Sequence, residues 1–187
     1  MNEIIRKASI EDAYGISYVS AYSWTETYTG LVSDEYLAQK INNLSEKAKK
    51  TEEFLKTNHN YLVAVVDNQV VGFCSYHKLE ENLGKICALY LLKKYQKQGI
   101  GKRLFFEGIS KLIDLGCNKM IIECMHGNDT INFYKHYDGK VIKTIDYYLK
   151  NNEKVKVDIL EFNNIKNLLN QNNKKSYNEK NISNLSR

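Results

Sequence analysis

Residues 86–104 read ICALYLLKKYQKQGIGKRL, and this stretch decides the fold. It begins as a continuous apolar run from Ile86 to Leu92, which is typical of a strand that is buried on both faces. Polar residues and two glycines follow, and after them apolar residues recur at helical spacing. The stretch therefore predicts a buried strand, a glycine-containing turn and a helix. Such a turn brings the backbone close to a ligand, and the start of the helix suits an anion such as a phosphate.

The spacing of the glycines separates the known kinds of phosphate loop. The Walker pattern needs four residues between its glycines and then Lys and Ser or Thr, which this chain lacks. The dinucleotide fingerprint G-x-G-x-x-G fails because Leu104 occupies the place of its third glycine. The pattern Q/R-x-x-G-x-G does fit, at Gln96, Gly99 and Gly101. With its preceding strand the loop resembles the acetyl-CoA pyrophosphate loop of the GNAT acetyltransferase superfamily; an ordinary turn with a capping glycine is the alternative.

Two further segments resemble the same superfamily. Residues 121–134 read IIECMHGNDTINFY. They resemble its signature of an apolar strand, then Gly-Asn, then Phe-Tyr, here at Asn128, Phe133 and Tyr134. The glycine pair that usually follows is reduced to Gly139. Residues 24–37 read WTETYTGLVSDEYL and look like the N-terminal helices that line the acceptor site in one subgroup.

The order of the expected elements agrees with this resemblance, which covers residues 3 to about 165. A first strand, three helices, a hairpin at 61–76, the central strand with its helix and three further strands follow one another. We expect an α/β (α+β) fold: a GNAT-like three-layer sandwich with a central mixed, mostly antiparallel sheet of about seven strands, flanked by helices. Residues 1–169 are expected to form the N-acetyltransferase domain. Residues 170–187 are expected to form a polar, Asn- and Lys-rich tail that is disordered.

Composition and charge limit the partners. The chain has 187 residues and a formal net charge of +5, but five basic residues and one acidic residue lie within 163–187. Since the charge is concentrated outside the expected folded body, nucleic-acid binding is not expected. No apolar run is long enough to cross a membrane, and no signal segment is recognised. Four cysteines without a C-x-x-C pair predict buried free thiols and a cytoplasmic protein. We expect no metal site.

The resemblance implies a site for acetyl-CoA as co-substrate. The pantetheine arm is expected along the backbone of the central strand, at Leu89, Tyr90 and Leu91. The pyrophosphate is expected on backbone N–H groups of the loop, whose residues are Gln96, Lys97, Gln98, Gly99, Ile100, Gly101 and Lys102. Asn128 is expected to contact the cofactor, to cap the helix after it, or both.

The catalytic residues are less defined by the sequence. In the superfamily a tyrosine in the place of Tyr134 protonates the leaving CoA thiolate, and packing beside Phe133 is the alternative. For the base we consider His126, since its intrinsic pKa suits the task, Glu123, or a water molecule held by backbone carbonyl groups. Glu123 is also expected to contact the acceptor. Trp24 and Tyr28 are expected either to form an aromatic wall for the acceptor or to pack in the core.

These observations lead to one expected function and two alternatives. We expect an N-acetyltransferase that moves the acetyl group of acetyl-CoA to a primary amine of a small molecule, by direct attack in a ternary complex. Acetylation of protein N-termini or lysines is the first alternative. A non-catalytic CoA-binding regulatory module is the second, because Gly84 and Lys85 stand where many relatives carry an acid. A homodimer is compatible with the sequence, which does not identify the acceptor.

Overall fold

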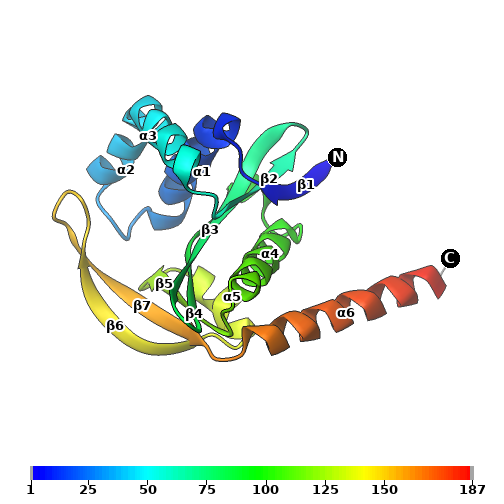
Figure 1. Ribbon diagram of the computed structural model, residues 1–187. Helices are drawn as coiled ribbons and strands as arrows, with labels where there is room; N and C mark the ends of the chain where they lie inside the picture. Colours follow the sequence, from blue (N-terminus) through cyan, green and yellow to red (C-terminus); the bar gives the residue numbers. More distant parts are fainter. Residues whose placement is uncertain (1, 186–187) are drawn as a thin grey trace.

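A computed structural model describes the backbone of residues 2–185 and the side chains through residue 178. The helices and strands follow one another along the chain as shown in Figure 1. Their bounds are β1 (Glu3–Lys7), η1 (Ile10–Asp12), α1 (Ala13–Tyr28), α2 (Asp34–Asn42), α3 (Leu44–Thr57), β2 (Tyr61–Val66), β3 (Gln69–Glu80), β4 (Leu83–Leu91), η2 (Lys93–Tyr95), α4 (Ile100–Asp114), β5 (Lys119–Met125), α5 (Thr130–His136), β6 (Lys140–Tyr148), β7 (Lys154–Phe162) and α6 (Ile165–Leu185).

Seven strands form one sheet in the order β1-β2-β3-β4-β5-β7-β6. Every neighbouring pair is antiparallel except β4 and β5, which run parallel. The predicted mixed, mostly antiparallel sheet of about seven strands with flanking helices is therefore confirmed. The single parallel pair joins the strands β1–β4 to the strands β5–β7, so the middle of the sheet is the place where its two halves can separate.

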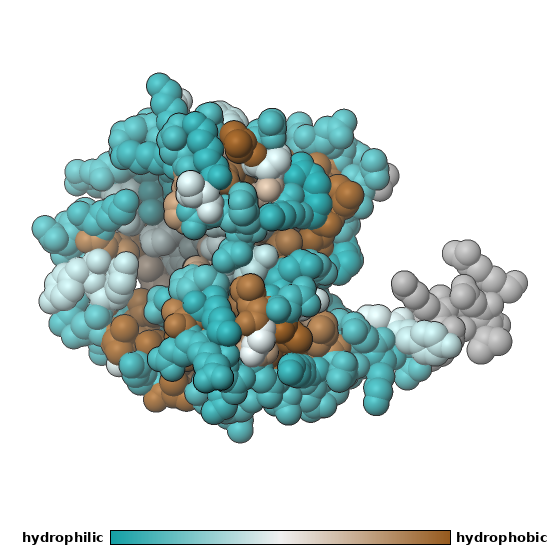
Figure 2. All heavy atoms as spheres, in the orientation of Figure 1, coloured by the Kyte–Doolittle hydropathy of each residue, from teal (hydrophilic) through white to brown (hydrophobic). Residues whose placement is uncertain are grey.

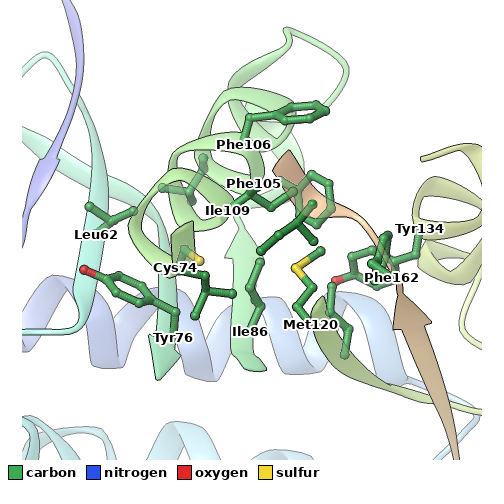
Figure 3. Packing of buried hydrophobic residues seen from close by; sticks show 14 of the residues in the cluster. Leu62, Cys74, Tyr76, Ile86, Phe105, Phe106, Ile109, Met120, Tyr134 and Phe162 are labelled. Atoms are coloured by element: carbon green, nitrogen blue, oxygen red, sulfur yellow. The ribbon is translucent and has the colours of Figure 1, made fainter. Parts of the chain in front are cut away.

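Helices cover both faces of the sheet, and the alternation of side chains along β2 shows how. Leu62 and Ala64 belong to the core cluster that contains α4, whereas Val63 and Val65 belong to the cluster beneath α1. Successive side chains of a strand point to opposite faces, so α4 and α1 lie on opposite sides of the sheet. Figure 3 shows the α4 side, where Phe105 and Ile109 pack against Ile86 and Met120 of the central strands.

Local interactions explain where several elements begin. At the start of η1, the backbone N–H of Ser9 donates to Asp12 Oδ2 over 2.8 Å, as expected for a capping box. The Ser33 hydroxyl accepts a hydrogen bond from the backbone N–H of Tyr36 at the start of α2. Asp67 and Asn68, with φ of 46° and 65°, form the tight turn of the β2–β3 hairpin. These three signals were readable in the sequence.

The last helix corrects one expectation. We expected residues 170–187 to be disordered, but α6 runs from Ile165 to Leu185 and projects away from the sheet (Figure 1). Ile165 and Leu168 are buried in the same core cluster as α4, so the first turn is anchored. Neither glycine nor proline occurs after residue 162. A helix that is nucleated by packing can extend through such a segment, because adding a residue is easier than starting a helix.

Candidate functional site

The main cleft of the described residues opens where β4 and β5 separate. Their parallel pairing is limited to Leu83–Ile86 against Lys119–Ile122, and beyond it the two strands diverge. A bulge accompanies the divergence, since Ser75 pairs with Ala88 and Tyr76 pairs with Ile86, so Cys87 is the extra residue of β4. The resulting cleft has a volume of about 550 Å³. It leaves the β5-facing backbone edge of β4, from residue 87 to residue 91, without a strand partner.

The glycine loop closes one end of this cleft. Gly99 has a φ of +80°, a conformation that side chains with a Cβ atom rarely adopt, and it stands directly before α4. The Gln96 side chain donates from Nε2 to the carbonyl oxygen of Leu91 over 3.0 Å, which ties the loop to the end of β4. Gln98 makes a similar bond to the carbonyl oxygen of Lys94. The two glutamines therefore shape the loop through backbone contacts.

Gly101 differs from Gly99, because the protein itself does not require a glycine there. A Cβ atom at Gly101 would meet only Leu91 Cδ2, at 3.6 Å, which is ordinary van der Waals contact. The first N–H groups of a helix have no partner in the turn before it, and the described residues supply none for Ile100, Gly101 or Lys102. The bare backbone at Gly101 therefore faces space in the cleft and can receive an anionic ligand closely.

Charge at this end comes from two lysines. Lys97 and Lys102 both line the cleft, beside the exposed start of α4. Arg103, the next basic residue, is directed elsewhere because its guanidinium group pairs with Glu3 on β1. Two ammonium groups and the positive end of a helix dipole thus meet at the loop, an arrangement that suits a pyrophosphate.

Tyr134 lies on the opposite wall and is only 5% exposed. Its ring packs against Phe105 and Phe133, and Figure 3 shows its hydroxyl pointing back toward the sheet. Burial raises the pKa of Tyr134 far above its ordinary value, so the hydroxyl stays protonated. Because Tyr134 forms no side-chain hydrogen bond with another described residue, the hydroxyl is available to donate to a ligand in the cleft.

Asn128 lines the same wall and is nearly buried. Its side-chain oxygen accepts a hydrogen bond from the backbone N–H of Thr130 over 2.9 Å, so it supports the first turn of α5. The expected capping role is therefore present. Asn128 also lines the cleft, and contact between its side-chain amide N–H groups and a ligand stays a prediction.

A hydrogen-bonded aromatic group forms another wall of the cleft, and we call this wall the acceptor side because the sequence predicted the acceptor there. Trp24 Nε1 donates to the Tyr90 hydroxyl over 2.9 Å, and Tyr28 is hydrogen-bonded to the same hydroxyl. Tyr28 and Tyr90 line the cleft, but Trp24 does not and stands behind them. Trp24 therefore orients the wall instead of forming its surface. Figure 2 shows the molecular surface hollowed between the part that contains α1–α3 and the β6–β7 hairpin.

The two candidate bases have different places. Glu123 lines the cleft, but its side chain is 39% exposed and its carboxylate lies 2.6 Å from the ammonium group of Lys85. It is therefore not the buried carboxylate that the apolar strand suggested. His126 is outside the cleft lining and is largely exposed. Its Nδ1 lies 2.9 Å from the buried carboxylate of Asp158, which also accepts from the Thr144 hydroxyl. His126 is thus held against β7, away from the cleft.

Most of the residues that the sequence singled out converge on one cleft. The expected residues that line it are Tyr28, Leu89, Tyr90, Leu91, Gln96, Lys97, Gly99, Gly101, Lys102, Glu123, Asn128 and Tyr134. Four expected residues do not line it. Trp24 and His126 stand as described above, Gln98 bonds within its own loop, and Ile100 is buried in the core at 1% exposure. Ile100 can still contribute its backbone N–H group.

Sequence reasoning missed the polar face of α1. Ser23 lines the cleft and is 2% exposed, yet its hydroxyl has no hydrogen-bond partner among the described residues. Ser17 and Ser20 are buried on the same helix. Serines that recur every three residues among apolar residues were a readable signal, but the aromatic residues beside them drew the interpretation. Among the described side chains, which end at residue 178, no group of three or more potential metal ligands occurs, and no described helix has the length and apolarity to span a membrane.

Known proteins resemble this chain in sequence and fold. The model of the acetyltransferase (GNAT) family matches residues 20–139. A spermidine N(1)-acetyltransferase of Thermoplasma acidophilum is 32% identical in an alignment of 140 residues that covers 71% of this chain and 84% of that protein. The uncharacterised N-acetyltransferase YuaI of Bacillus subtilis is 29% identical in an alignment of 138 residues that covers 71% of this chain and 78% of that protein.

Solved structures give the same result. The crystal structure of the PaiA N-acetyltransferase of Thermoplasma acidophilum, in complex with coenzyme A, aligns with a TM-score of 0.67 and 25% identity. The alignment covers 87% of this chain and 99% of that one. A GCN5-related N-acetyltransferase of Rhodopseudomonas palustris aligns with a TM-score of 0.70 over 87% of this chain and 96% of that one; at 16% identity it supports the fold alone.

Proposed function

The chain belongs to the acetyltransferase (GNAT) family, and on that premise we propose that it transfers the acetyl group of acetyl-CoA to a primary amine of a small molecule. The observation that carries the proposal is the divergence of β4 and β5 between an anion-binding loop and a buried tyrosine. In the reaction, the amine nitrogen bonds to the carbonyl carbon of the thioester, the carbon–sulfur bond breaks, and the CoA thiolate gains a proton. An amide and free CoA are the products.

The residues of this cleft fit coenzyme A. The open space at Gly101 and the unpartnered N–H groups at the start of α4 suit the pyrophosphate, with Lys97 and Lys102 adding positive charge. The unpaired backbone edge of β4 suits the amide groups of the pantetheine arm, because it offers both donors and acceptors at Leu89 and Leu91. These residues bind and orient the co-substrate, and the chemistry that it supplies is an activated acetyl group.

Tyr134 is proposed as the proton donor to the leaving thiolate. Its hydroxyl is held protonated by burial and has no competing partner within the described part of the chain. A proton donor in reach of a developing thiolate lowers the barrier to its departure. His126 has no part in this scheme because it lies outside the cleft, paired with Asp158. After the neutral amine has attacked, its nitrogen is proposed to lose a proton to water in the cleft, and water returns a proton to Tyr134.

A small acceptor is favoured over a peptide by the β6–β7 hairpin. The carboxylate of Glu153 at its tip accepts hydrogen bonds from the backbone N–H and the hydroxyl of Ser33, over 2.9 and 2.7 Å. Leu149 of the same tip is buried against residues of α1 and α2, including Tyr36. The hairpin thus spans the acceptor side, where a protein acetyltransferase needs an open groove for an extended chain. Glu123 and Tyr28 are proposed to contact the acceptor.

Release of free CoA thiol is the measurement that tests this proposal. The purified chain would be mixed with acetyl-CoA and a panel of amino acids, polyamines, aminoglycosides and short peptides, and the acetylated product would be identified by mass spectrometry. We expect at least one small amine to support turnover well above the rate of acetyl-CoA hydrolysis. Turnover with peptides alone would replace the proposal with protein acetylation. CoA binding without any amine-dependent release would replace it with a regulatory module.

A further inference from the structure

Three lysines meet beside the acceptor side of the cleft, and we call Lys40, Lys47 and Lys150 the lysine cluster. Lys40 is on α2, Lys47 is on α3, and Lys150 is in the turn between β6 and β7. The Lys40 ammonium group lies 3.8 Å from the centre of the Trp24 ring. The Lys47 ammonium group donates to the Ser20 hydroxyl over 2.8 Å. The Lys40 ammonium group also lies over the ring of Tyr36, which is hydrogen-bonded to the backbone of Lys150, so three separate elements bring positive charge to one region.

None of these three lysines pairs with a carboxylate in the described part of the chain. The other lysines of α3 behave differently, since Lys50 pairs with Glu46 and Lys56 pairs with Glu53 on the solvent side of the helix. Lys40 and Lys47 are instead partly buried. Burial, together with the charges of the other two members, lowers the pKa of Lys40 to about 8. The Trp24 and Tyr36 rings offset part of this cost through cation–π contact.

The lysine cluster is close to the reaction cleft. Lys40 contacts the face of the Trp24 ring. Nε1 of the same ring donates to the hydroxyl of Tyr90, which lines the cleft. The tip of the hairpin connects to the same place, because the backbone of Lys150 is hydrogen-bonded to the Tyr36 hydroxyl. Ser23, one residue before Trp24, brings to the cleft a buried hydroxyl without a described partner. Neither Trp24 nor the three lysines line the cleft itself, so a ligand must extend beyond Tyr28 and Tyr90, past Trp24, to meet the lysines.

We propose that the lysine cluster binds an anionic group of the acceptor, a carboxylate or a phosphate, so that the preferred acceptor is an amine that carries a negative charge at its other end. An anion there would offset the repulsion among the three ammonium groups and take up their free N–H donors. A polyamine would bring further positive charge to the same place. Glu123 offers little to such a cation, because its charge is already paired with Lys85. This inference rests on the proposed function and names its class of substrate.

A binding experiment tests the anion site without any turnover. Trp24 is the single tryptophan of the chain and touches Lys40, so its fluorescence reports on the cluster directly. The probe is inorganic phosphate, added with CoA at saturation so that the glycine loop is already filled. We expect a saturable change that is weakened about tenfold in Lys40→Gln and in Lys47→Gln, the scale of one hydrogen bond to a charged group. The matched control Lys50→Gln, on α3 and paired with Glu46, should titrate as the wild type does.

A turnover experiment tests the class of acceptor. Butylamine, γ-aminobutyrate and putrescine share a carbon chain of similar length but end in a methyl, a carboxylate and an ammonium group; hexylamine, ε-aminocaproate and hexamethylenediamine form a longer set. We expect the carboxylates to have a kcat/KM at least about tenfold above their partners, through KM. Lys40→Gln should remove this preference, whereas the control Lys50→Gln should keep it and leave the turnover of butylamine and hexylamine unchanged.

The outcomes separate this inference from the proposed function. Equal or better turnover of the diamines, with no effect of Lys40→Gln, would overturn the anionic acceptor while leaving acetyl transfer intact. Absence of thiol release with every amine would reject the proposed function, whereas the fluorescence titration would still decide whether the lysine cluster binds an anion. A titration curve that is identical in the wild type and both lysine variants would reject the anion site itself. Melting temperatures of all variants show whether each remains folded.

Discussion

The two ends of the cleft are built in different ways. The loop end uses residues that are consecutive in the chain, from the end of β4 to the first turn of α4, and it offers mainly backbone N–H groups. The proposed acceptor end is lined by side chains of α1, β4 and β5, and residues of α2, α3 and the β6–β7 hairpin stand behind them. Backbone N–H groups can bind the phosphate of any ligand that presents one in the same position. A site made of side chains changes its preference when one of these side chains is substituted. One end can therefore serve a shared co-substrate while the other selects the acceptor.

The largest expected effect lies between the two ends, at Tyr134. Tyr134→Phe removes one hydroxyl and keeps the ring packing against Phe105 and Phe133. If this hydroxyl protonates the thiolate, turnover should fall by about 10²–10⁴-fold, the usual range for general acid catalysis. Affinity for acetyl-CoA should change little. Single-turnover measurements are the appropriate readout, because slow product release would hide part of the loss. Full single-turnover activity in this variant would leave the ring with a packing role only.

At the loop end we expect a loss of affinity without a loss of stability. Gly101→Ala adds a Cβ atom that the fold accommodates but that points to the space proposed for the pyrophosphate. Gly101→Val blocks more of it and should weaken acetyl-CoA binding about ten- to a hundredfold, as when one or two hydrogen bonds to a charged group are lost. Calorimetry measures the affinity and thermal melting the stability. Lys94→Gln, outside the cleft lining, is the matched control. Unchanged affinity in Gly101→Val would contradict the loop assignment.

At the acceptor end, the pH dependence of the melting temperature should reveal the lowered pKa of Lys40. Its pKa is about 8 in the folded chain and 10.5 when exposed, so between these values the unfolded chain binds more protons. Stability contributed by this group therefore rises as pH increases from about 8 to 10. Relative to Lys40→Met, the wild type should gain on the order of 5 °C in melting temperature over this range. Lys47 and Lys150 lower the same pKa, so phosphate bound among them should abolish the gain. A constant difference between the two proteins would exclude a perturbed Lys40.

The smallest effect is expected outside both ends. A chain that stops after Asn173 keeps Ile165, Leu168 and Leu169, the apolar residues of α6 that pack on the body. Its melting temperature should fall by less than about 2 °C, since the described side chains that are removed, at residues 174–178, are mainly exposed. Affinity for acetyl-CoA and acceptor preference should stay the same. A large change in either ligand property would mean that the last part of α6 acts on the cleft.

The sequence predicted those features that depend on residues close together in the chain. The apolar run, the two glycines and the helical spacing after them predicted the strand, the loop and α4, because phosphate binding there uses backbone geometry that a short segment sets by itself. The hairpin turn at Asp67 and Asn68 and the caps at Ser9 and Ser33 are local for the same reason. The sheet of about seven strands was expected from the order of the elements together with the family resemblance.

What only the tertiary structure decided depends on distances between residues far apart in the chain. His126 has a suitable intrinsic pKa, but pairing with Asp158, 32 residues later, holds it outside the cleft. Glu123 sits in an apolar strand, yet Lys85 across the β4–β5 pair neutralises it. The lysine cluster draws its members from three elements, so no local pattern indicates it. Burial and charge pairing depend on how distant segments pack together. A local sequence pattern does not give the distances between residues of such segments.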